Sequence, residues 1–368
     1  MSTKKDKFSK QDINYMKLAL NLAKARDGLT GVNPSVGCVI VKNDKIISIG
    51  QTGYNGRPHA ESNAIYNCSE NLEGSKIYIT LEPCNHYGKT PPCTNLIIKK
   101  KIKEAFYSID DIDKKVKGKS FKILKSNGII VKKGLLKKKI TNFYKNYFFT
   151  RKYKIPYVTG KIAVAKNNLI YSKNKKKITD IHSDKFTHFL RYKNDSLIVS
   201  STTLNKDNPK LNCRLVGFNK FSPKRIILDN NLKTNINSYI FKTANKNNTI
   251  IFFNKADKIQ IAFFKKKGIK LIKSNLIKDD YFDLKAILKK LYSLGSRNIL
   301  VEGGDILSGS FLKNKIFNQF YLFKSNKNLS KNCAFKDFSH FKKLTQSYKS
   351  KIKINSKFGK DLITLYKR

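Results

Sequence analysis

Four residues in the first third of the chain have the types and spacing of a metal-dependent active site. His59 and Glu61 are separated by one residue, and Cys84 and Cys93 follow a stretch that ends in Leu-Glu-Pro. One imidazole and two thiolates are good ligands for Zn²⁺ and leave its fourth tetrahedral position open for water. Zinc makes such a water acidic enough to act as a nucleophile near neutral pH. The pattern therefore predicts a catalytic zinc site held by His59, Cys84 and Cys93.

Glu61 favours a catalytic over a structural zinc site. It need not bind the metal, and it can carry a proton from the water to a leaving amine, which is typical of zinc-dependent nucleobase deaminases. A structural site would need a fourth nearby Cys or His, and His86 is the one rival, which we expect to face the substrate instead. Taken singly, the histidine and the two cysteines would be ordinary buried residues. Helix N-termini expected at Cys84 and Cys93 would favour the thiolate forms.

Helices and strands that could position these residues alternate through the first 150 residues. A helix is expected over 10–27, because apolar residues recur there at helical spacing, and a hairpin is expected over 33–50. The later expected elements are a helix from 59, a strand over 75–83, a helix over 94–102, a strand over 104–109, and a helix and short strand over 117–134. This alternation predicts a layered α/β domain.

A second α/β domain is expected after an aromatic, basic stretch at 141–156. Strands are expected over 157–165, 195–201, 224–229, 248–253, 269–272 and 298–304, with a helix over 283–295. These elements predict an open, mostly parallel sheet. We place the domains at 1–150 and 151–368, and the tail from about 326 gives few signals.

Composition limits the cellular setting but does not name a partner. The chain has 368 residues, six cysteines and a formal net charge of +51. It has no long apolar run and its first residues do not resemble a secretory signal, so we expect a cytoplasmic protein without a membrane partner. The lysine runs are spread out and no nucleic-acid module accompanies them, so we expect no specific nucleic-acid partner. Assembly as a homo-oligomer is left open.

The motif sequences resemble a known enzyme family. HAESNAI (59–65) and IYITLEPCNHYGKTPPCTNLI (77–97), with NPSVGCVIV (33–41) upstream, are similar to the deaminase domain of the bifunctional riboflavin-biosynthesis deaminase/reductase family. Eight residues separate the two cysteines, where cytidine deaminase-like enzymes typically have two. The resemblance covers about 10–150 and implies a cytidine deaminase-like three-layer domain that uses Zn²⁺.

The resemblance also implies a small-molecule substrate. This is 2,5-diamino-6-(phosphoribosylamino)pyrimidinone, whose ring amine is hydrolysed with release of ammonia. Asn33 would hydrogen-bond the ring edge, His86 would stack or donate, and Lys89 would meet the phosphate. The alternatives are that Asn33 is a turn residue and Lys89 a solvated lysine. Ser108 to Asp113 departs from the family's usual Asp-Pro-Asn run.

The second half is similar to the family's reductase domain, which has a dihydrofolate reductase-like α/β fold. The matching segments are LRYKNDSLIVSSTTLNKDNPKLNCR (190–214) and ILVEGGDILSGSFL (299–312). The resemblance implies that NADPH reduces the ribosyl group to ribityl. It implies substrate contacts at Arg191, Leu211, Arg214 and Glu302. It implies cofactor contacts at Ala163, Lys177, Thr203, Asp207, Asn230, Gly304, Asp305, Ile306, Leu307, Ser308, Gly309 and Ser310.

Two departures weaken the reductase prediction. Ala165 to Leu169 replaces the family's usual Ser-Leu-Asp-Gly-Arg-like loop, and Lys175 and Lys177 stand where relatives have a serine and a tryptophan. The preferred interpretation is a bifunctional enzyme. The alternatives are a tRNA-type polynucleotide deaminase, which the high charge would suit, a deaminase with a vestigial reductase domain, and a zinc-stabilised binding protein. Ammonia release and NADPH consumption, followed separately, discriminate these hypotheses.

Overall fold

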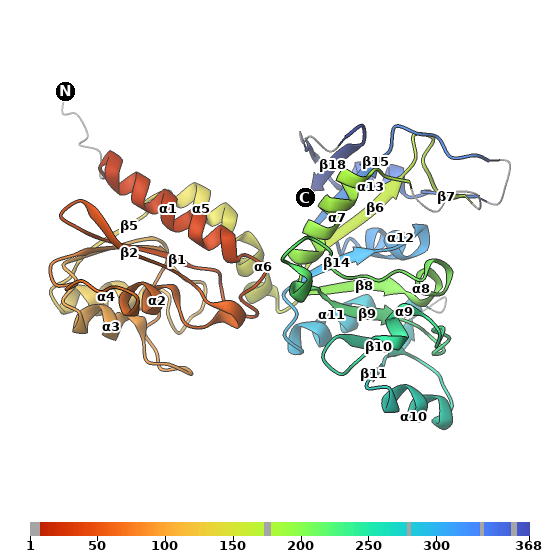
Figure 1. Ribbon diagram of the computed structural model, residues 1–368, viewed down its shortest axis with the longest axis horizontal. Coiled ribbons are helices and arrows are strands. Elements are labelled where there is room, and N and C mark those ends of the chain that lie inside the picture. Colours follow the sequence, from red (N-terminus) through yellow and green to blue (C-terminus); the bar gives the residue numbers. More distant parts are fainter. Residues whose placement is uncertain (1–7, 173–177, 278–280, 332–334, 355–358) are drawn as a thin grey trace. The chain divides into compact units, whose positions relative to one another are not determined.

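The computed structural model describes residues 8–172, 178–277, 281–331, 335–354 and 359–368. The chain divides into two compact units, Met1–Lys154 and Ile155–Arg368. Each unit is built on its own sheet (Figure 1).

The N-terminal unit is a three-layer α/β/α domain. Its sheet has the strand order β2-β1-β3-β4-β5, in which β1 runs antiparallel to β2 and β3 while β3, β4 and β5 are parallel. The strands are β1 (Gly37–Lys42), β2 (Lys45–Gln51), β3 (Lys76–Leu81), β4 (Glu104–Ile109) and β5 (Ile130–Lys133). The helices are α1 (Lys10–Arg26), the short η1 (Tyr54–Gly56), α2 (Ala60–Tyr66), α3 (Cys93–Lys99), α4 (Lys119–Ser126), α5 (Lys137–Phe143) and α6 (Lys145–Tyr153). Helices α1 and α5 cover one face of the sheet, and α2, α3 and α4 cover the other (Figure 1).

Two strand glycines let helices pack directly on the sheet. A Cβ atom at Gly37 would lie 1.9 Å from the carbonyl oxygen of Ala19 in α1. A Cβ atom at Gly50 would lie 2.2 Å from the carbonyl oxygen of Ala60 in α2. Real Cβ atoms do not approach so closely, so any side chain at either position would push a helix off the sheet. The second contact fixes the start of α2, which follows His59.

The C-terminal unit contains a nine-stranded sheet with the order β11-β10-β9-β8-β14-β6-β15-β18-β17. The strands from β11 to β15 are parallel and only the β15-β18 and β18-β17 pairs are antiparallel, so the expected open, mostly parallel sheet is confirmed. These strands are β6 (Tyr157–Val164), β8 (Ser196–Ser200), β9 (Lys224–Leu228), β10 (Thr249–Phe253), β11 (Lys270–Lys273), β14 (Asn298–Glu302), β15 (Gln319–Lys324), β17 (Ser350–Lys353) and β18 (Leu362–Lys367). Two small pairs are β7 (Leu169–Ser172) with β16 (Phe335–Asp337) and β12 (Leu276–Ile277) with β13 (Tyr281–Phe282). The helices are α7 (Ile181–Tyr192), α8 (Ser201–Asp207), η2 (Asn219–Phe221), α9 (Tyr239–Lys242), α10 (Lys258–Lys266), α11 (Leu284–Ser293), α12 (Asp305–Lys313) and α13 (Phe341–Ser347).

Two stretches that gave weak sequence signals are ordered elements. The aromatic, basic stretch at 141–156 contains the end of α5 and all of α6, and α6 ends at Tyr153, just before Pro156. The tail contributes β18, which pairs along its whole length with β15. Both stretches owe their order to packing partners far away in the sequence.

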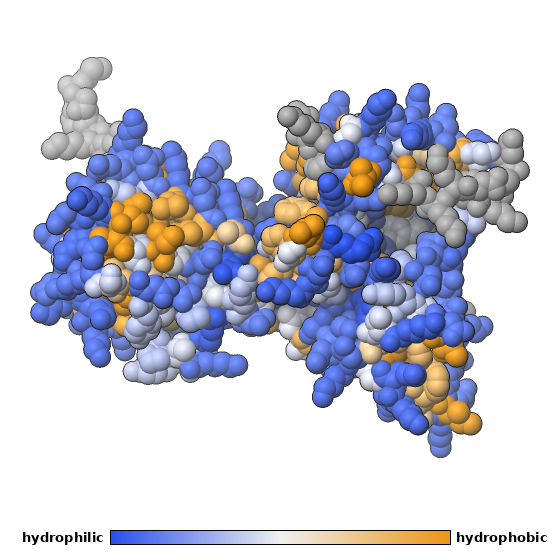
Figure 2. Space-filling view, in the orientation of Figure 1, coloured by the Kyte–Doolittle hydropathy of each residue, from blue (hydrophilic) through white to orange (hydrophobic). Residues whose placement is uncertain are grey.

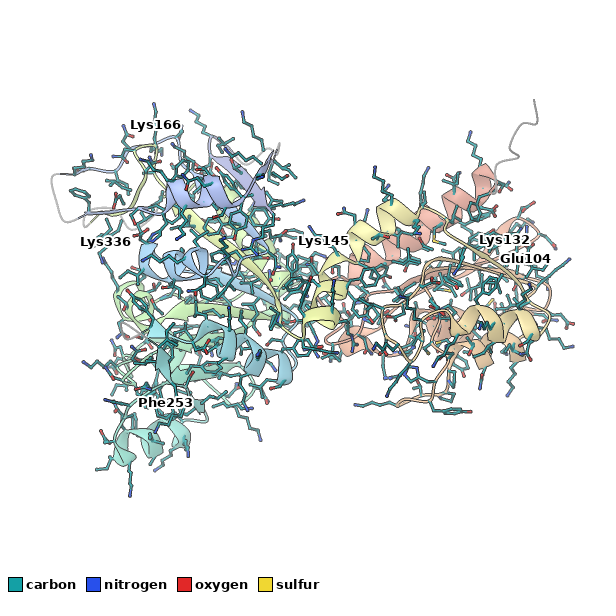
Figure 3. All side chains as sticks on the ribbon, turned by 180° about the vertical axis from the view of Figure 1, so that it is seen from behind. Glu104, Lys132, Lys145, Lys166, Phe253 and Lys336 are labelled. Atoms are coloured by element: carbon teal, nitrogen blue, oxygen red, sulfur yellow. The ribbon has the colours of Figure 1, made fainter. Side chains whose placement is uncertain are left out.

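The surface is strongly polar, as the composition requires. Hydrophilic side chains cover most of the face seen in Figure 2, with smaller apolar areas between them. One acidic group of this surface, Glu104, lies 3.0 Å from the Nζ atom of Lys132 (Figure 3) and 3.9 Å from that of Lys76. No helix in the described part of the chain is long and apolar enough to cross a membrane.

Candidate active sites

The three predicted zinc ligands come together in the N-terminal unit. His59 caps the start of α2, Cys84 lies in the loop after β3, and Cys93 is the first residue of α3. The Nδ1 atom of His59 lies 3.5 Å from the Sγ atom of Cys84 and 3.4 Å from that of Cys93. The three ligand atoms lie within 4.8 Å of one another, and neither cysteine is in a disulfide. One nitrogen and two sulfurs at this separation fit a zinc ion with an open fourth position.

Helix α3 favours a thiolate at Cys84, although the helix start expected at that residue is wrong. Cys84 is in a loop, and the backbone N–H of Cys93, at the first position of α3, donates to its Sγ atom at 3.3 Å. Hydrogen bonds from Cys93 and His59 lower the pKa of Cys84 to about 4. The hydrogen bond to Cys84, together with burial, raises the pKa of Cys93. A negative sulfur among these ligands suits a metal cation.

Glu61 lies in the first turn of α2 and is only 4% exposed. Burial raises its pKa to about 7, because a charged carboxylate is poorly solvated there. A carboxyl group with a pKa near neutral can both accept and return a proton, as a general acid/base must.

His59, Cys84 and Glu61 line a cavity of about 140 Å³. Asn33 and His86, for which substrate contacts are predicted, both line this cavity. The Nδ2 atom of Asn33 donates to the carbonyl oxygen of Gly56 at 2.9 Å, which holds the side chain in place. The Nδ1 atom of His86 is buried and has no hydrogen-bond partner among the residues that the structure describes. Lys89 is exposed and is not among the lining residues.

Several residues of this cavity were not found from the sequence. Glu82 accepts backbone N–H groups from Asp111, Gly118 and Ser120 at 3.0–3.1 Å and so anchors the loop after β4 beside the cavity. The other unforeseen lining residues include Arg57, Asp111, Asp113, Tyr147 and Arg151. Tyr147 and Arg151 come from α6, whose aromatic, basic composition was the only signal.

In the C-terminal unit, two predicted substrate residues form a buried ion pair. The Nε and Nη2 atoms of Arg191, on α7, each lie 2.7 Å from a carboxylate oxygen of Glu302, at the end of β14. The neighbouring charges hold the pKa of Glu302 below its usual range despite burial, and Arg191 is the largest of them. Lys161, which sequence reasoning missed, is the register partner of Glu302 on β6, and burial lowers its pKa.

The other two predicted substrate residues lie on the segment after α8. Leu211 is buried and has a left-handed backbone conformation with φ of 50°. Arg214 is exposed and donates to the side chain of Asn212 at 2.9 Å, while Arg191 donates to the backbone oxygen of Asn212 at 3.1 Å. Asn212 therefore links the two arginines.

A larger cavity of about 680 Å³ lies beside the ends of β8 and β9 and the start of α12. This volume is in the range of cofactor cavities. Of the predicted cofactor residues, Asn230, Ile306, Leu307 and Ser310 line it. The remaining described ones, Ala163, Thr203, Asp207, Gly304, Asp305, Ser308 and Gly309, are not among its lining residues. Lys177, like Lys175, lies outside the described residues.

Some of the non-lining residues have structural partners instead. The backbone N–H of Thr203 is capped by the side chain of Ser200 at the start of α8. The carboxylate of Asp305 accepts hydrogen bonds from Ser339 and lies 2.9 Å from the Nδ1 atom of His340. A Cβ atom at Gly309 would meet the same imidazole at 2.3 Å. The glycine-rich turn is thus packed against the segment before α13.

Comparison with known proteins gives matches over both units. Residues 9–109 match the cytidine and deoxycytidylate deaminase zinc-binding region, and residues 161–327 match the RibD C-terminal domain. The riboflavin biosynthesis protein RibD of Aquifex aeolicus is 34% identical over 359 residues, which cover 97% of this chain and 98% of that protein. RibD of Buchnera aphidicola is 34% identical over 368 residues, which cover 96% and 97%.

Solved structures agree over the whole length. RibD of Acinetobacter baumannii superposes with a TM-score of 0.84 at 26% identity, covering 97% of this chain and 98% of that chain. The diaminohydroxyphosphoribosylaminopyrimidine deaminase/5-amino-6-(5-phosphoribosylamino)uracil reductase of Thermotoga maritima gives 0.79 at 29% identity, with the same coverage. The family and fold expected from the sequence are therefore confirmed, and the chain belongs to the RibD family of bifunctional deaminase/reductase enzymes of riboflavin biosynthesis.

Proposed function

We propose that this enzyme deaminates 2,5-diamino-6-(phosphoribosylamino)pyrimidinone and then reduces the ribosyl group of the product to ribityl with NADPH. The deaminase activity is assigned to residues 1–150 and the reductase activity to 151–368. The observation that carries the proposal is the cluster of His59, Cys84 and Cys93 beside the cavity that buried Glu61 lines. The activities for which the Thermotoga maritima relative is named supply the substrate and product classes.

In the deaminase site, His59, Cys84 and Cys93 would hold the zinc. When bound there, zinc supplies an acidic water as the nucleophile. Glu61 takes a proton from the attacking water and returns it to the ring amine, which then leaves as ammonia. Asn33 is held by Gly56 so that its amide can orient the ring, and the unpartnered Nδ1 atom of His86 offers a further hydrogen bond to it.

In the reductase site, the buried ion pair prepares a place for the phosphoribosyl group. Glu302 would accept hydrogen bonds from its hydroxyl groups, and Arg191 and Arg214 would face its phosphate. Lys161, held beside Glu302 and with a lowered pKa, is suited to donate a proton to the sugar oxygen as hydride arrives at the carbon. NADPH supplies the hydride, and Asn230 with Ile306, Leu307 and Ser310 would hold it in the larger cavity.

The setting proposed is the cytoplasm, because zinc-binding thiolates persist as free cysteines in a reducing compartment. A specific nucleic-acid partner is not part of the proposal. The lysine-rich surface has no single clustered stripe in the sequence, and both cavities suit small molecules.

Turnover of the purified chain on the phosphoribosylated diaminopyrimidine tests both steps, with ammonia and NADPH followed separately. We expect stoichiometric zinc, ammonia release without NADPH, and NADPH oxidation only after ammonia release. Ammonia release with no NADPH oxidation at saturating cofactor would show that the second site is vestigial. Deamination of tRNA but not of the small molecule would favour a polynucleotide deaminase.

A further inference from the structure

A cluster of polar side chains lies near the larger cavity of the C-terminal unit but is not part of its lining. Asp305 is the first residue of α12, and Ser339 and His340 directly precede α13. The Nδ1 atom of His340 lies 2.9 Å from the Oδ1 atom of Asp305. The backbone N–H and the hydroxyl group of Ser339 donate to the two carboxylate oxygens at 2.9 and 2.6 Å. One short segment therefore holds the carboxylate at three points.

The carboxyl group of Asp305 is charged in this setting. Burial would raise its pKa, but the hydrogen bonds from His340 and Ser339 hold the pKa below its usual range. A charged carboxylate only accepts hydrogen bonds, so the Nδ1 atom of His340 is the donor in their contact. The cluster thus engages a negative charge at the start of a helix.

The contact between His340 and Asp305 depends on the glycine one turn further along α12. A Cβ atom at Gly309 would lie 2.3 Å from the Cε1 atom of His340, closer than real Cβ atoms approach. The imidazole is a rigid ring, so it could not give way without leaving the carboxylate of Asp305. Gly309 therefore makes room for the imidazole, and this packing explains the glycine without a cofactor contact.

Helix α12 turns a neighbouring face to the cavity. Ile306 and Ser310 line the cavity, whereas Asp305 and Gly309 meet His340. Each pair is four residues apart and so lies on one face, and the two faces are about 100° apart around the helix. No described side chain caps the start of α12, so its positive end is not already taken up by a capping oxygen.

The lining of the cavity suits an anionic ligand. Lys206 and Lys233 are among the lining residues. The acidic lining residue, Asp229, accepts hydrogen bonds from the backbone N–H groups of Lys233 and Thr234 and from the hydroxyl group of Thr234. These residues fit the phosphate groups of a dinucleotide. An unengaged carboxylate at Asp305 would repel such phosphates and would compete with them for the positive end of α12.

We propose that Ser339 and His340 are positioning residues that hold the Asp305 carboxylate away from the cofactor cavity, so that an acidic helix start can border a site for NADPH. This inference rests on the NADPH-dependent step of the proposed function. Asp305 and Gly309 then affect the cofactor without touching it, in place of the direct contacts that the family resemblance implies.

Equilibrium binding of NADPH to the zinc-loaded chain, followed by nicotinamide fluorescence, tests this inference. His340→Ala releases the carboxylate and should weaken binding roughly 5- to 30-fold, the effect of a misplaced charge at a partly buried helix start. Adding Asp305→Asn to His340→Ala removes the charge and should restore most of the affinity. His340→Asn, whose amide offers a donor near the place of Nδ1, should also recover most of it. Asp337→Asn, which removes an exposed acid on β16, is the matched control and should equal wild type.

Gly309 provides a second cycle of variants. Gly309→Ala should displace the imidazole and weaken NADPH binding as His340→Ala does. The Gly309→Ala/His340→Ala variant should bind no more weakly than His340→Ala alone, because both changes break the same contact. In the reductase assay, the loss in each variant should appear in KM for NADPH and not in kcat. Losses that multiply in the double variant would mean that Gly309 meets the cofactor itself, and they would overturn the inference.

The same measurements separate this inference from the proposed function. If His340 only supported the fold, the Asp305→Asn/His340→Ala variant would stay as weak as His340→Ala, and the inference would be wrong. Unchanged NADPH binding in His340→Ala would also overturn it, while NADPH binding by the wild type would leave the proposed function standing. A wild type that binds no NADPH would contradict the proposed reductase step and this inference with it.

Discussion

The two candidate active sites differ in how far apart in the sequence their residues lie. In the N-terminal unit, the three zinc ligands and Glu61 lie within 35 residues, and each stands at the start of a helix or directly after a strand. In the C-terminal unit, the central ion pair joins Arg191 and Glu302, which are 111 residues apart. Metal coordination fixes residue types and geometry so tightly that it leaves a readable motif. A substrate-binding surface made of long side chains tolerates more variation in residue type and spacing, so its sequence motif is weaker.

The largest effect is expected when the proton carrier of the first site is removed. Glu61→Gln should lower ammonia release by about 10²- to 10⁴-fold, because general acid/base catalysis typically contributes that much. The variant should keep its zinc, since Glu61 is not among the three clustered ligands. His59→Ala and Cys84→Ser should lose both zinc and ammonia release. Metal analysis with an ammonia assay checks this, and stoichiometric zinc retained in both ligand variants would refute the site.

The same variant separates the two sites. NADPH oxidation by Glu61→Gln should equal that of wild type when the deaminated product is supplied directly. A parallel loss of reduction would mean that the two activities are not independent.

A smaller but still large effect is expected at the buried ion pair. Glu302→Ala leaves Arg191 and Lys161 as uncompensated cations in a buried place, and breaking such a pair costs about 3–5 kcal/mol of stability. Reduction should be lost while ammonia release persists. Denaturant unfolding and the two activity assays measure this.

Arg214→Ala is the matched control for that loss. Arg214 is exposed, so its replacement should weaken reduction without the stability loss. If Glu302→Ala unfolds no more easily than Arg214→Ala, the ion pair is not the structural centre of the second site.

The same contrast explains what could be predicted from the sequence. The hairpin over 33–50 was predicted from an apolar run and the Asn43-Asp44 turn that follows it, and both turn residues adopt positive φ angles. Helix α6 was not predicted, because its aromatic and basic residues serve the cavity and the core instead of following one apolar stripe. Strand β18 was missed because its place depends on β15, about forty residues earlier. Elements with a local sequence pattern could be predicted, and elements that depend on pairing with a distant segment could not.

The residues of the candidate sites show the same difference between local and long-range information. Asn33 and His86 could be predicted because they sit within the motif; both line the cavity, and their substrate contacts stay a prediction. Tyr147, Arg151 and Lys161 were missed because only the folded chain brings them to a site. Lys89 lies in the most specific stretch of the motif and yet is exposed. The phosphate contact of Lys89 therefore stays a prediction.

An intermediate effect is expected from pH on the C-terminal unit. Asp195 accepts the backbone N–H groups of Arg297 and Asn298 at 2.8 and 3.0 Å, and burial raises its pKa from 3.8 to about 6. A raised pKa in the folded state means that the neutral acid is favoured, so its stabilising contribution is present below pH 4 and is lost as the pH rises through 6. The unit should lose up to about 3 kcal/mol of stability over this range.

Asp195→Asn should flatten that dependence, because the amide stays neutral. Hydrogen exchange of the β8 and β14 amides between pH 4 and 7 isolates this unit from the other. A slope of the same size in the variant would assign the pH dependence to other groups.

The smallest effect is expected from the surface charges of the N-terminal unit, which are plentiful but weak. Glu104 pairs with Lys132 and Lys76 across neighbouring strands, and its side chain is 14% exposed while the lysines are 40–41% exposed. Such pairs are screened by water and salt and contribute about 0.2–1 kcal/mol each. Glu104→Gln removes both pairs and should therefore lower the stability of this unit by no more than about 2 kcal/mol, and the loss should shrink as salt rises. Denaturant unfolding at two salt concentrations measures it, with Glu73→Gln, which removes the more exposed pair to Lys101, as the control. Both activities should stay at wild-type levels in these variants, because neither pair borders a cavity. A large, salt-independent loss of stability in Glu104→Gln would instead mean that the high positive charge makes each acidic group a necessary part of the fold.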